Sequence, residues 1–194
     1  MQETTNATTR FGFLARGGAL AAGLMSGGAL TGGVARADGE ADLANARLVL
    51  GAERLAVAFY TRWLATTRDP TLRPLLLALR KEEEVHSRAL AAVIGPTAPV
   101  DADFRFVLPA ATLRSPSGAL GLAATLERTF AGIAIGAAGS TGDPGLRTLF
   151  ARLAASEGAH LAALEGRRGR PLTHALPDPL DLQGASDALA PYLQ

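Results

Sequence analysis

The chain of 194 residues contains no cysteine. This absence excludes disulfides, thiolate-bound zinc, iron–sulfur clusters and a catalytic thiol, so any bound metal must use oxygen and nitrogen ligands. Aromatic residues are also scarce, at 5% of the chain, whereas Ala, Leu and Gly are abundant. This mixture favours closely packed helices over a β-sandwich, and the length suits one well-buried domain.

The chain also lacks an excess of charge of either sign, since it has 19 basic and 18 acidic side chains. No cluster of Lys and Arg is interleaved with aromatic residues, as a nucleic-acid surface would require. We therefore expect no nucleic-acid partner. The expected partners are a small oxidant or a metal ion, and a homo-oligomer is left open.

The first 37 residues are typical of an export signal. Arg10 and Arg16 precede the uncharged stretch 17–35, which ends in the Ala-Arg-Ala triplet 35–37. Seven glycines make this stretch weakly apolar, although about 19 uncharged residues are nominally long enough for a membrane anchor. We predict cleavage after Ala37, a periplasmic or extracellular protein, and no stable membrane insertion once the signal is removed.

Residues 9–14, with the sequence TRFGFL, resemble a twin-arginine export motif. Phe11 stands where the second arginine belongs, so the translocation route is left open. Cleavage would leave 16 basic residues (19 minus Arg10, Arg16 and Arg36) and 17 acidic ones (18 minus Glu3). The mature chain is then close to neutral, with a formal charge of −1.

Four segments with helical spacing of apolar residues follow the signal. They span about Glu40–Thr66, Pro70–Ile94, Ser117–Ser140 and Pro144–Gly166. Short turns with Asp-Pro pairs separate the first helix from the second and the third from the fourth, so each pair is expected to be antiparallel. We predict an all-α, antiparallel four-helix bundle over residues 38–166.

Two proline-rich segments interrupt or follow this pattern. Residues 96–116 contain four prolines and no sustained helical pattern, and we interpret them as a long crossover between helices two and three. Residues 167–194 also contain four prolines. We expect this C-terminal extension to lie as an extended strap on the bundle surface.

An internal repeat places acidic residues in all four helices. Glu53 precedes Glu83 by 30 residues, and Glu127 precedes Glu157 by 30 residues. Each second Glu is followed three residues later by a histidine, and these two histidines are His86 and His160. On a helix, positions i and i+3 share one face, so each Glu-x-x-His pair can direct a carboxylate and an imidazole to one point.

The neighbouring residues indicate that these polar side chains lie on the apolar faces of their helices. Leucines and valines recur at steps of three and four residues around each Glu-x-x-His pair. Four carboxylates in an apolar core would repel one another and take up protons, and we expect two divalent cations to neutralise them. The predicted ligands are Glu53, Glu83, His86, Glu127, Glu157 and His160.

Ligands that are rich in oxygen, with one imidazole for each metal, suit iron first and manganese second. One Glu from each of two helices and Glu-x-x-His from each of the other two is the pattern of di-iron carboxylate bundles. A single Glu-x-x-His is usually an exposed pair. Here, however, two of the chain's three histidines follow a Glu at the same offset, and each of those Glu residues has its own upstream Glu.

Other polar residues are interpreted more plainly. Glu82 and Glu84 flank the predicted ligand in the second helix and are expected to be solvated beside basic neighbours. Tyr60 is either a core tyrosine or a hydrogen-bond donor to a ligand. His174 is expected to lie on the surface without a metal-binding partner.

Two glycines in the third helix lie about one helical turn apart. Gly132 and Gly136 are four residues apart and follow Glu127. They serve either close packing or room for a small oxidant, and packing is the preferred interpretation.

The segment GAERLAVAFY, residues 51–60, and the two Glu-x-x-His segments make the chain similar to the bacterial exported ferritin-like domain family. Members of this family often follow a twin-arginine-type signal, and the resemblance covers about residues 38–166. It implies a ferritin-like bundle and the ligands named above. It does not fix an activity, because many members are known only by their fold and some are described as related to desiccation.

We expect an exported di-metal oxidoreductase in which two metal ions oxidise ferrous iron or dismute peroxide, with Glu53 or Glu127 bridging them or shifting during turnover. The absence of cysteine argues against a rubrerythrin of the usual kind. The alternative is a non-catalytic metal-binding or stress-protective structural protein in which the metals hold the core together.

Overall fold

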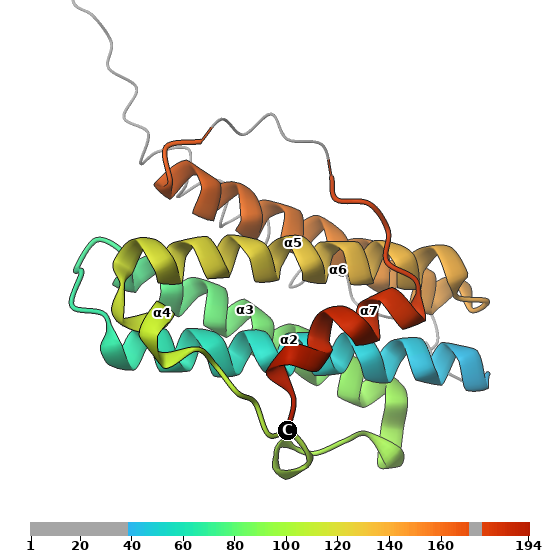
Figure 1. The fold of residues 1–194 in the computed structure, drawn as a ribbon. Helices are drawn as coiled ribbons and strands as arrows, with labels where there is room; N and C mark the ends of the chain where they lie inside the picture. Colours follow the sequence, from blue (N-terminus) through green and yellow to red (C-terminus); the bar gives the residue numbers. More distant parts are fainter. Residues whose placement is uncertain (1–38, 171–175) are drawn as a thin grey trace, which may run out of the picture. The chain divides into compact units, whose positions relative to one another are not determined.

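The computed structural model describes residues 39–170 and 176–194. The predicted export signal and His174 lie outside the described residues. Four long helices dominate the described part of the chain (Figure 1). They are α2 (Glu40–Thr66), α3 (Arg73–Ile94), α5 (Pro116–Ser140) and α6 (Pro144–Arg167). The predicted all-α bundle is confirmed, and the predicted helix ends agree to within three residues.

Local side-chain chemistry explains where these helices begin and end. The side chain of Ser115 accepts a hydrogen bond from Gly118 N before α5, and that of Asp143 accepts one from Leu146 N before α6. A proline occupies the first position of both helices, where its missing N–H costs nothing. Helix α3 ends at Ile94 and is followed by Gly95, whose φ of 76° favours glycine.

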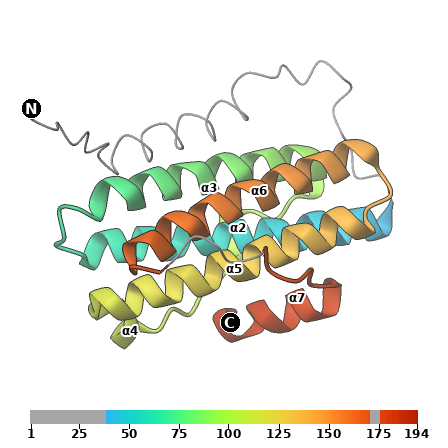
Figure 2. The same ribbon diagram turned by 90° about the horizontal axis from the view of Figure 1, so that it is seen from above.

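The helices pair as two hairpins. Helix α2 packs along α3, α5 packs along α6, and α2 also contacts α5 (Figure 2). Their inner faces carry large buried side chains, including Phe59, Trp63, Leu76 and Phe150, each no more than 1% exposed. This packing fixes which face of each helix points into the core.

The long crossover between α3 and α5 is present, but it contains short helices. These are η1 (Gly95–Thr97), η2 (Asp101–Asp103) and α4 (Ala110–Arg114). Leu108 and Leu113 are buried and anchor the crossover against the bundle. Pieces this short give no periodic pattern in a sequence, which explains why only a loop was expected.

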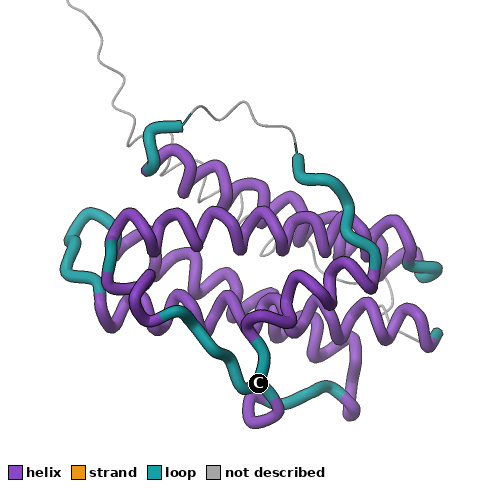
Figure 3. The backbone as a smooth tube through the Cα atoms, viewed as in Figure 1, coloured by secondary structure: helices purple, strands orange, loops and turns teal. Residues whose placement is uncertain are grey.

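The C-terminal extension departs from the prediction. Residues 176–181 are non-helical, as expected, but helix α7 (Leu182–Leu189) and the turn η3 (Ala190–Tyr192) follow. Figure 3 shows this terminal helix lying along the bundle. Ala185 and Leu189 are buried against α5 and α2. The expectation of a wholly extended strap is wrong, because prolines flank this segment without interrupting it.

The chain end also contacts the crossover. Phe106 and Leu193 form an antiparallel bridge, supported by hydrogen bonds from Val107 N to Tyr192 O and from Gln194 N to Arg105 O, both 2.9 Å. Among the described residues this is an isolated bridge outside any strand. It ties the last residues to the segment that joins the two hairpins.

Helix α5 is, within the described residues, the one helix long and apolar enough to cross a membrane. More than half of its most apolar stretch, 56%, is buried inside the structure. It also holds the fully buried Glu127. Its apolar character is accounted for by its place in the bundle core.

Gly132 and Gly136 provide the close packing that was preferred for them. Gly132 O accepts a hydrogen bond of 2.9 Å from Leu180 N, and a Cβ at either glycine would collide with the backbone of residues 178–180. The segment before α7 therefore lies directly on the surface of α5. Side chains at these two positions would push it away.

We expect Gly136→Ala to lower the free energy of unfolding by about 1–3 kcal/mol through this collision. Gly139→Ala in the same helix is the matched control, because a Cβ there meets nothing within 4 Å. That control should leave stability unchanged or raise it by up to about 1 kcal/mol. Denaturant unfolding followed by circular dichroism measures both, and equal effects would contradict the packing role.

Candidate metal centre

Each of the four long helices contributes to one buried cluster of acids and histidines. The cluster comprises Glu53 from α2, Glu83 and His86 from α3, Glu127 from α5, and Glu157 and His160 from α6. None of these residues is more than 3% exposed. The structure thus brings together all six residues that the sequence singled out.

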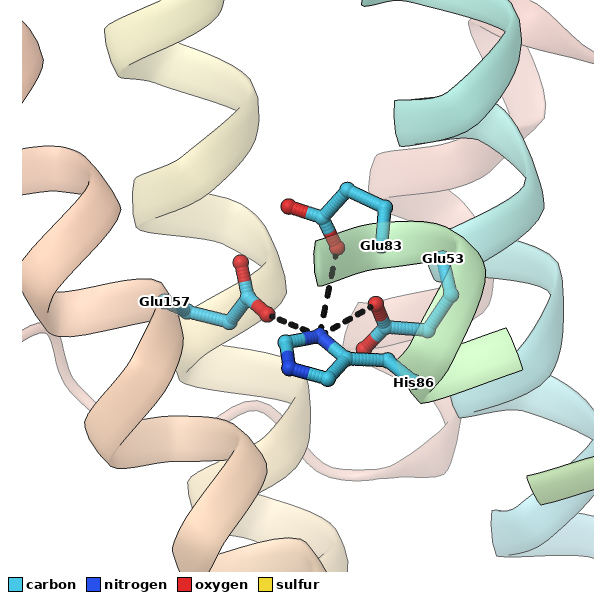
Figure 4. Close-up of side chains that lie close together, drawn as sticks. All are labelled: Glu53, Glu83, His86 and Glu157. Carbon is cyan, nitrogen blue, oxygen red and sulfur yellow. Dashed lines mark hydrogen bonds and ion pairs between the residues drawn. The ribbon is translucent and has the colours of Figure 1, made fainter. Parts of the chain in front are cut away.

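His86 organises the first half of the cluster (Figure 4). Its Nδ1 atom lies 3.1 Å from Glu53 Oε2, 3.3 Å from Glu83 Oε2 and 3.3 Å from Glu157 Oε1. Helices α2, α3 and α6 supply these three carboxylates. One ligand atom from each of the four residues lies within 4.8 Å of all the others, so a single ion placed among them can be bound by all four.

His160 organises the second half in the same way. Its Nδ1 atom lies 2.9 Å from Glu83 Oε1, 3.4 Å from Glu127 Oε2 and 3.4 Å from Glu157 Oε2. These four residues also offer ligand atoms within 4.8 Å of one another. The imidazole rings of His86 and His160 are stacked, with centroids 6.0 Å apart.

The two halves share two carboxylates. Glu83 and Glu157 each direct one oxygen to His86 and the other to His160. Glu53 contacts only the His86 half, and Glu127 contacts only the His160 half. The geometry therefore favours the Glu of each Glu-x-x-His pair for a place between two cations. A role of Glu53 or Glu127 in bridging the metals or shifting during turnover stays a prediction.

Several buried atoms of the cluster have no hydrogen-bond partner among the described residues. They are both carboxylate oxygens of Glu83 and of Glu157, Glu127 Oε2 and His160 Nδ1. Buried polar atoms are normally hydrogen-bonded, so a group of lone pairs that converge without donors fits cations placed between them. The donor set of carboxylate oxygens with one imidazole for each position suits iron or manganese.

The four carboxyl groups fall into two kinds, according to whether their surroundings raise or lower the pKa. Burial, aided by the charge of Glu157, raises the pKa of Glu53 well above its ordinary value, and it raises the pKa of Glu127 in the same way. Burial also acts to raise the pKa of Glu83 and of Glu157. There, however, the charge of the imidazoles, chiefly that of His160, outweighs burial, and the pKa of both groups is lowered.

The two imidazoles take up protons in response. Burial alone would lower the pKa of each, but the charge of Glu53 raises the pKa of His86, and the charges of Glu83 and Glu157 raise that of His160, far above the ordinary value. The shifts thus favour positive imidazoles beside Glu83 and Glu157 when no cation is bound. This agrees with the expectation that acids in an apolar core take up protons.

Two further residues support the cluster from outside. The Tyr60 hydroxyl donates a hydrogen bond to Glu127 Oε1, which decides between the two interpretations of that tyrosine. Glu82 Oε2 lies 2.8 Å from His160 Nε2, and its side chain is 26% exposed. The expectation that Glu82 is solvated is therefore wrong. Its long side chain, one position before the buried Glu83, reaches His160 on α6.

Glu84, on the other side of that ligand, behaves as the sequence suggested. Its side chain is 38% exposed and pairs with Arg80 at 3.3 Å, one helical turn away. The two acids that flank Glu83 therefore differ in kind. Only the position of α6 relative to α3 could reveal which of them faces the cluster.

The fold and the cluster define a class of protein: a helical bundle whose core holds a carboxylate and histidine cluster compatible with a two-metal site. The chain belongs to the ferritin-like domain family, whose sequence model matches residues 41–170. The match covers the four long helices, apart from Glu40, and all six residues of the cluster. A comparison with curated proteins finds no match.

Proposed function

We propose that this protein is an exported oxidoreductase that holds two iron ions in the buried cluster and acts on ferrous iron, peroxide or dioxygen. The observation that carries this proposal is the sharing of Glu83 and Glu157 between two adjacent sets of ligand atoms. Shared carboxylates hold two cations close together, which is the arrangement of a two-metal redox site. Manganese is the second choice of metal, since the same donors suit it.

Two iron ions in this place would supply the electrons for dioxygen or peroxide chemistry. The chain's own residues position them and exclude water. Glu53 and Glu127 close the two ends of the cluster, and every ligand is nearly or completely buried. Burial and the charge of Glu127 raise the pKa of Tyr60, so its hydroxyl keeps its proton and continues to hold Glu127 Oε1.

Export is part of the proposal and rests on the N-terminal sequence alone. The Arg-containing start, the uncharged stretch 17–35 and the Ala-Arg-Ala triplet are its basis. A protein that handles oxidants outside the cytoplasm benefits from having no cysteine, and after cleavage it also has no methionine to be oxidised.

A non-catalytic metal-binding protein, related to stress or desiccation, is the second candidate. The depth of the cluster favours it, because Glu83, Glu127 and Glu157 are all 0% exposed. Metals so deeply placed can act chiefly as a link between four helices. The two candidates share the site and differ in whether it turns over.

Elemental analysis combined with two activity assays separates them. We expect about two iron ions per chain, together with oxidation of ferrous iron or consumption of peroxide over many turnovers. A Glu83→Ala, Glu157→Ala double variant should lose both the metal and the turnover, while Glu84→Gln should keep both. Firmly held metal without any turnover would favour the structural candidate, and a double variant that retains its metal would refute the ligand assignment.

A further inference from the structure

We propose that the two metal positions are unequal, and that Glu82 makes the position at Glu127 and His160 the tighter of the two. This inference rests on the proposed two-metal function. It concerns the support around the ligands, since the ligands themselves are alike in the two halves.

The ligand sets of the two halves are related by one sequence offset. Glu53 and Glu127 lie 74 positions apart (127 minus 53), and the same offset relates Glu83 to Glu157 and His86 to His160. Each half thus offers one end carboxylate and one imidazole, and shares the same two bridging carboxylates. By ligands alone, the two positions would bind a cation equally.

The same offset shows that the supporting residues are not repeated. It relates Glu82 to Ser156 (82 plus 74) and Tyr60 to Ala134 (60 plus 74). Serine has no charge, and alanine has no hydrogen-bond donor in its side chain. Each support therefore exists in one half of the chain only.

Both supports act on the same metal position. Glu82 contacts His160, and Tyr60 donates to Glu127. His160 and Glu127 are the imidazole and the end carboxylate of one position. The opposite position, at Glu53 and His86, receives neither support.

The contact with Glu82 acts on His160 through its far nitrogen. With Nε2–H donating to Glu82 Oε2, the lone pair of Nδ1 is left facing the cluster. The carboxylate fixes the tautomer and the ring orientation, and it stabilises the positive charge that the imidazole gains on binding a cation. In other metal sites, removal of a partner of this kind typically lowers the metal affinity by about 10- to 100-fold.

His86 has no equivalent partner in the described part of the chain. Its three carboxylate contacts within 4 Å all involve Nδ1. In Figure 4 the dashed contacts all meet at one ring nitrogen of His86, and none is drawn to the other. His86 therefore lacks the charged support that orients His160.

Equilibrium binding of Mn²⁺ to the purified full chain tests this proposal. We expect two binding steps whose dissociation constants differ by about 10- to 100-fold. Glu82→Gln should weaken the tighter step by about the same factor and leave the weaker step in place. Glu84→Gln is the matched control, because it removes the same charge two residues away and should change neither step.

A second pair of variants assigns the effect to one position. In a Glu53→Gln background, which disables the His86 position, Glu82→Gln should still weaken Mn²⁺ binding by its full factor. In a Glu127→Gln background, which disables the His160 position, Glu82→Gln should no longer change Mn²⁺ binding. Equal weakening of both steps by Glu82→Gln, or no weakening of either, would overturn the inequality while leaving a two-metal protein. A wild-type chain that binds no Mn²⁺ and no iron would remove the proposed function and this inference together.

Discussion

A chain that carries Glu157→Gln is expected to retain less than about one metal ion, whereas Glu53→Gln retains about one. The difference follows from the geometry, because Glu157 directs an oxygen to both His86 and His160 while Glu53 contacts His86 alone. Loss of the shared carboxylate therefore removes one ligand from each position. Glutamine keeps the side-chain volume, so a packing defect does not cause the loss.

The expected weakening is large for the shared residue. Removing even an outer partner of a metal ligand commonly costs about 10- to 100-fold in affinity, and removing a direct ligand costs at least that much. For Glu157→Gln this loss applies to both ions at once. Glu83→Gln should behave in the same way, since Glu83 has the corresponding contacts.

Metal content after extensive dialysis, measured by elemental analysis, checks this prediction. The four single variants at Glu53, Glu83, Glu127 and Glu157 should fall into two groups, with the end carboxylates in one and the shared carboxylates in the other. Circular dichroism confirms that each variant remains helical. Equal metal loss in all four variants would show that no carboxylate is shared.

The sequence predicted the helices and the inward-facing polar residues of the cluster because both depend on patterns within one helix. Spacings of three and four residues identify the buried face, and a polar residue on that face is conspicuous. Glu83 and His86 lie one turn apart on such a face, so their meeting required no knowledge of the neighbouring helices. The same reasoning located Glu157 and His160.

The missed features all depend on how helices face one another. The shared position of Glu83 and Glu157 between the two histidines, and the contact of Glu82 with His160, arise from side-chain contacts between α3 and α6. A spacing along one helix cannot show which neighbour a side chain reaches. Helix α7 was missed for a related reason, since a helix of 8 residues is stabilised by its contacts with α5 and α2 rather than by its own pattern.

Binding of two divalent ions should release about four protons, and each ion's apparent affinity should rise by up to about 100-fold per pH unit near neutrality. The raised pKa values of Glu53, Glu127, His86 and His160 favour the protonated forms of these four groups in the metal-free cluster. The metal-bound cluster needs four carboxylates and two neutral imidazoles. Protons and metal ions therefore compete for the same lone pairs.

The direction of the pH effect follows from this competition. Because the four pKa values are raised, acid favours the protonated, metal-free cluster, and rising pH removes the competing protons and favours metal. Calorimetric Mn²⁺ titrations in two buffers of different ionisation enthalpy give the number of protons released. Glu84→Gln should release the same number as the wild type, because its carboxylate pairs with Arg80 outside the cluster. Release of less than about one proton per ion would contradict the charge assignment.

This exchange gives the cluster two neutral states, one held by protons and one by metal. In each state the carboxylates of Glu83 and Glu157 face positive charge, so we expect the bundle to stay folded when the ions have left. The two bridging carboxylates stay ionised in both states, since the imidazoles lower their pKa when metal is absent. For a protein exported as proposed, the pH outside the cytoplasm would then set how much of the chain carries metal.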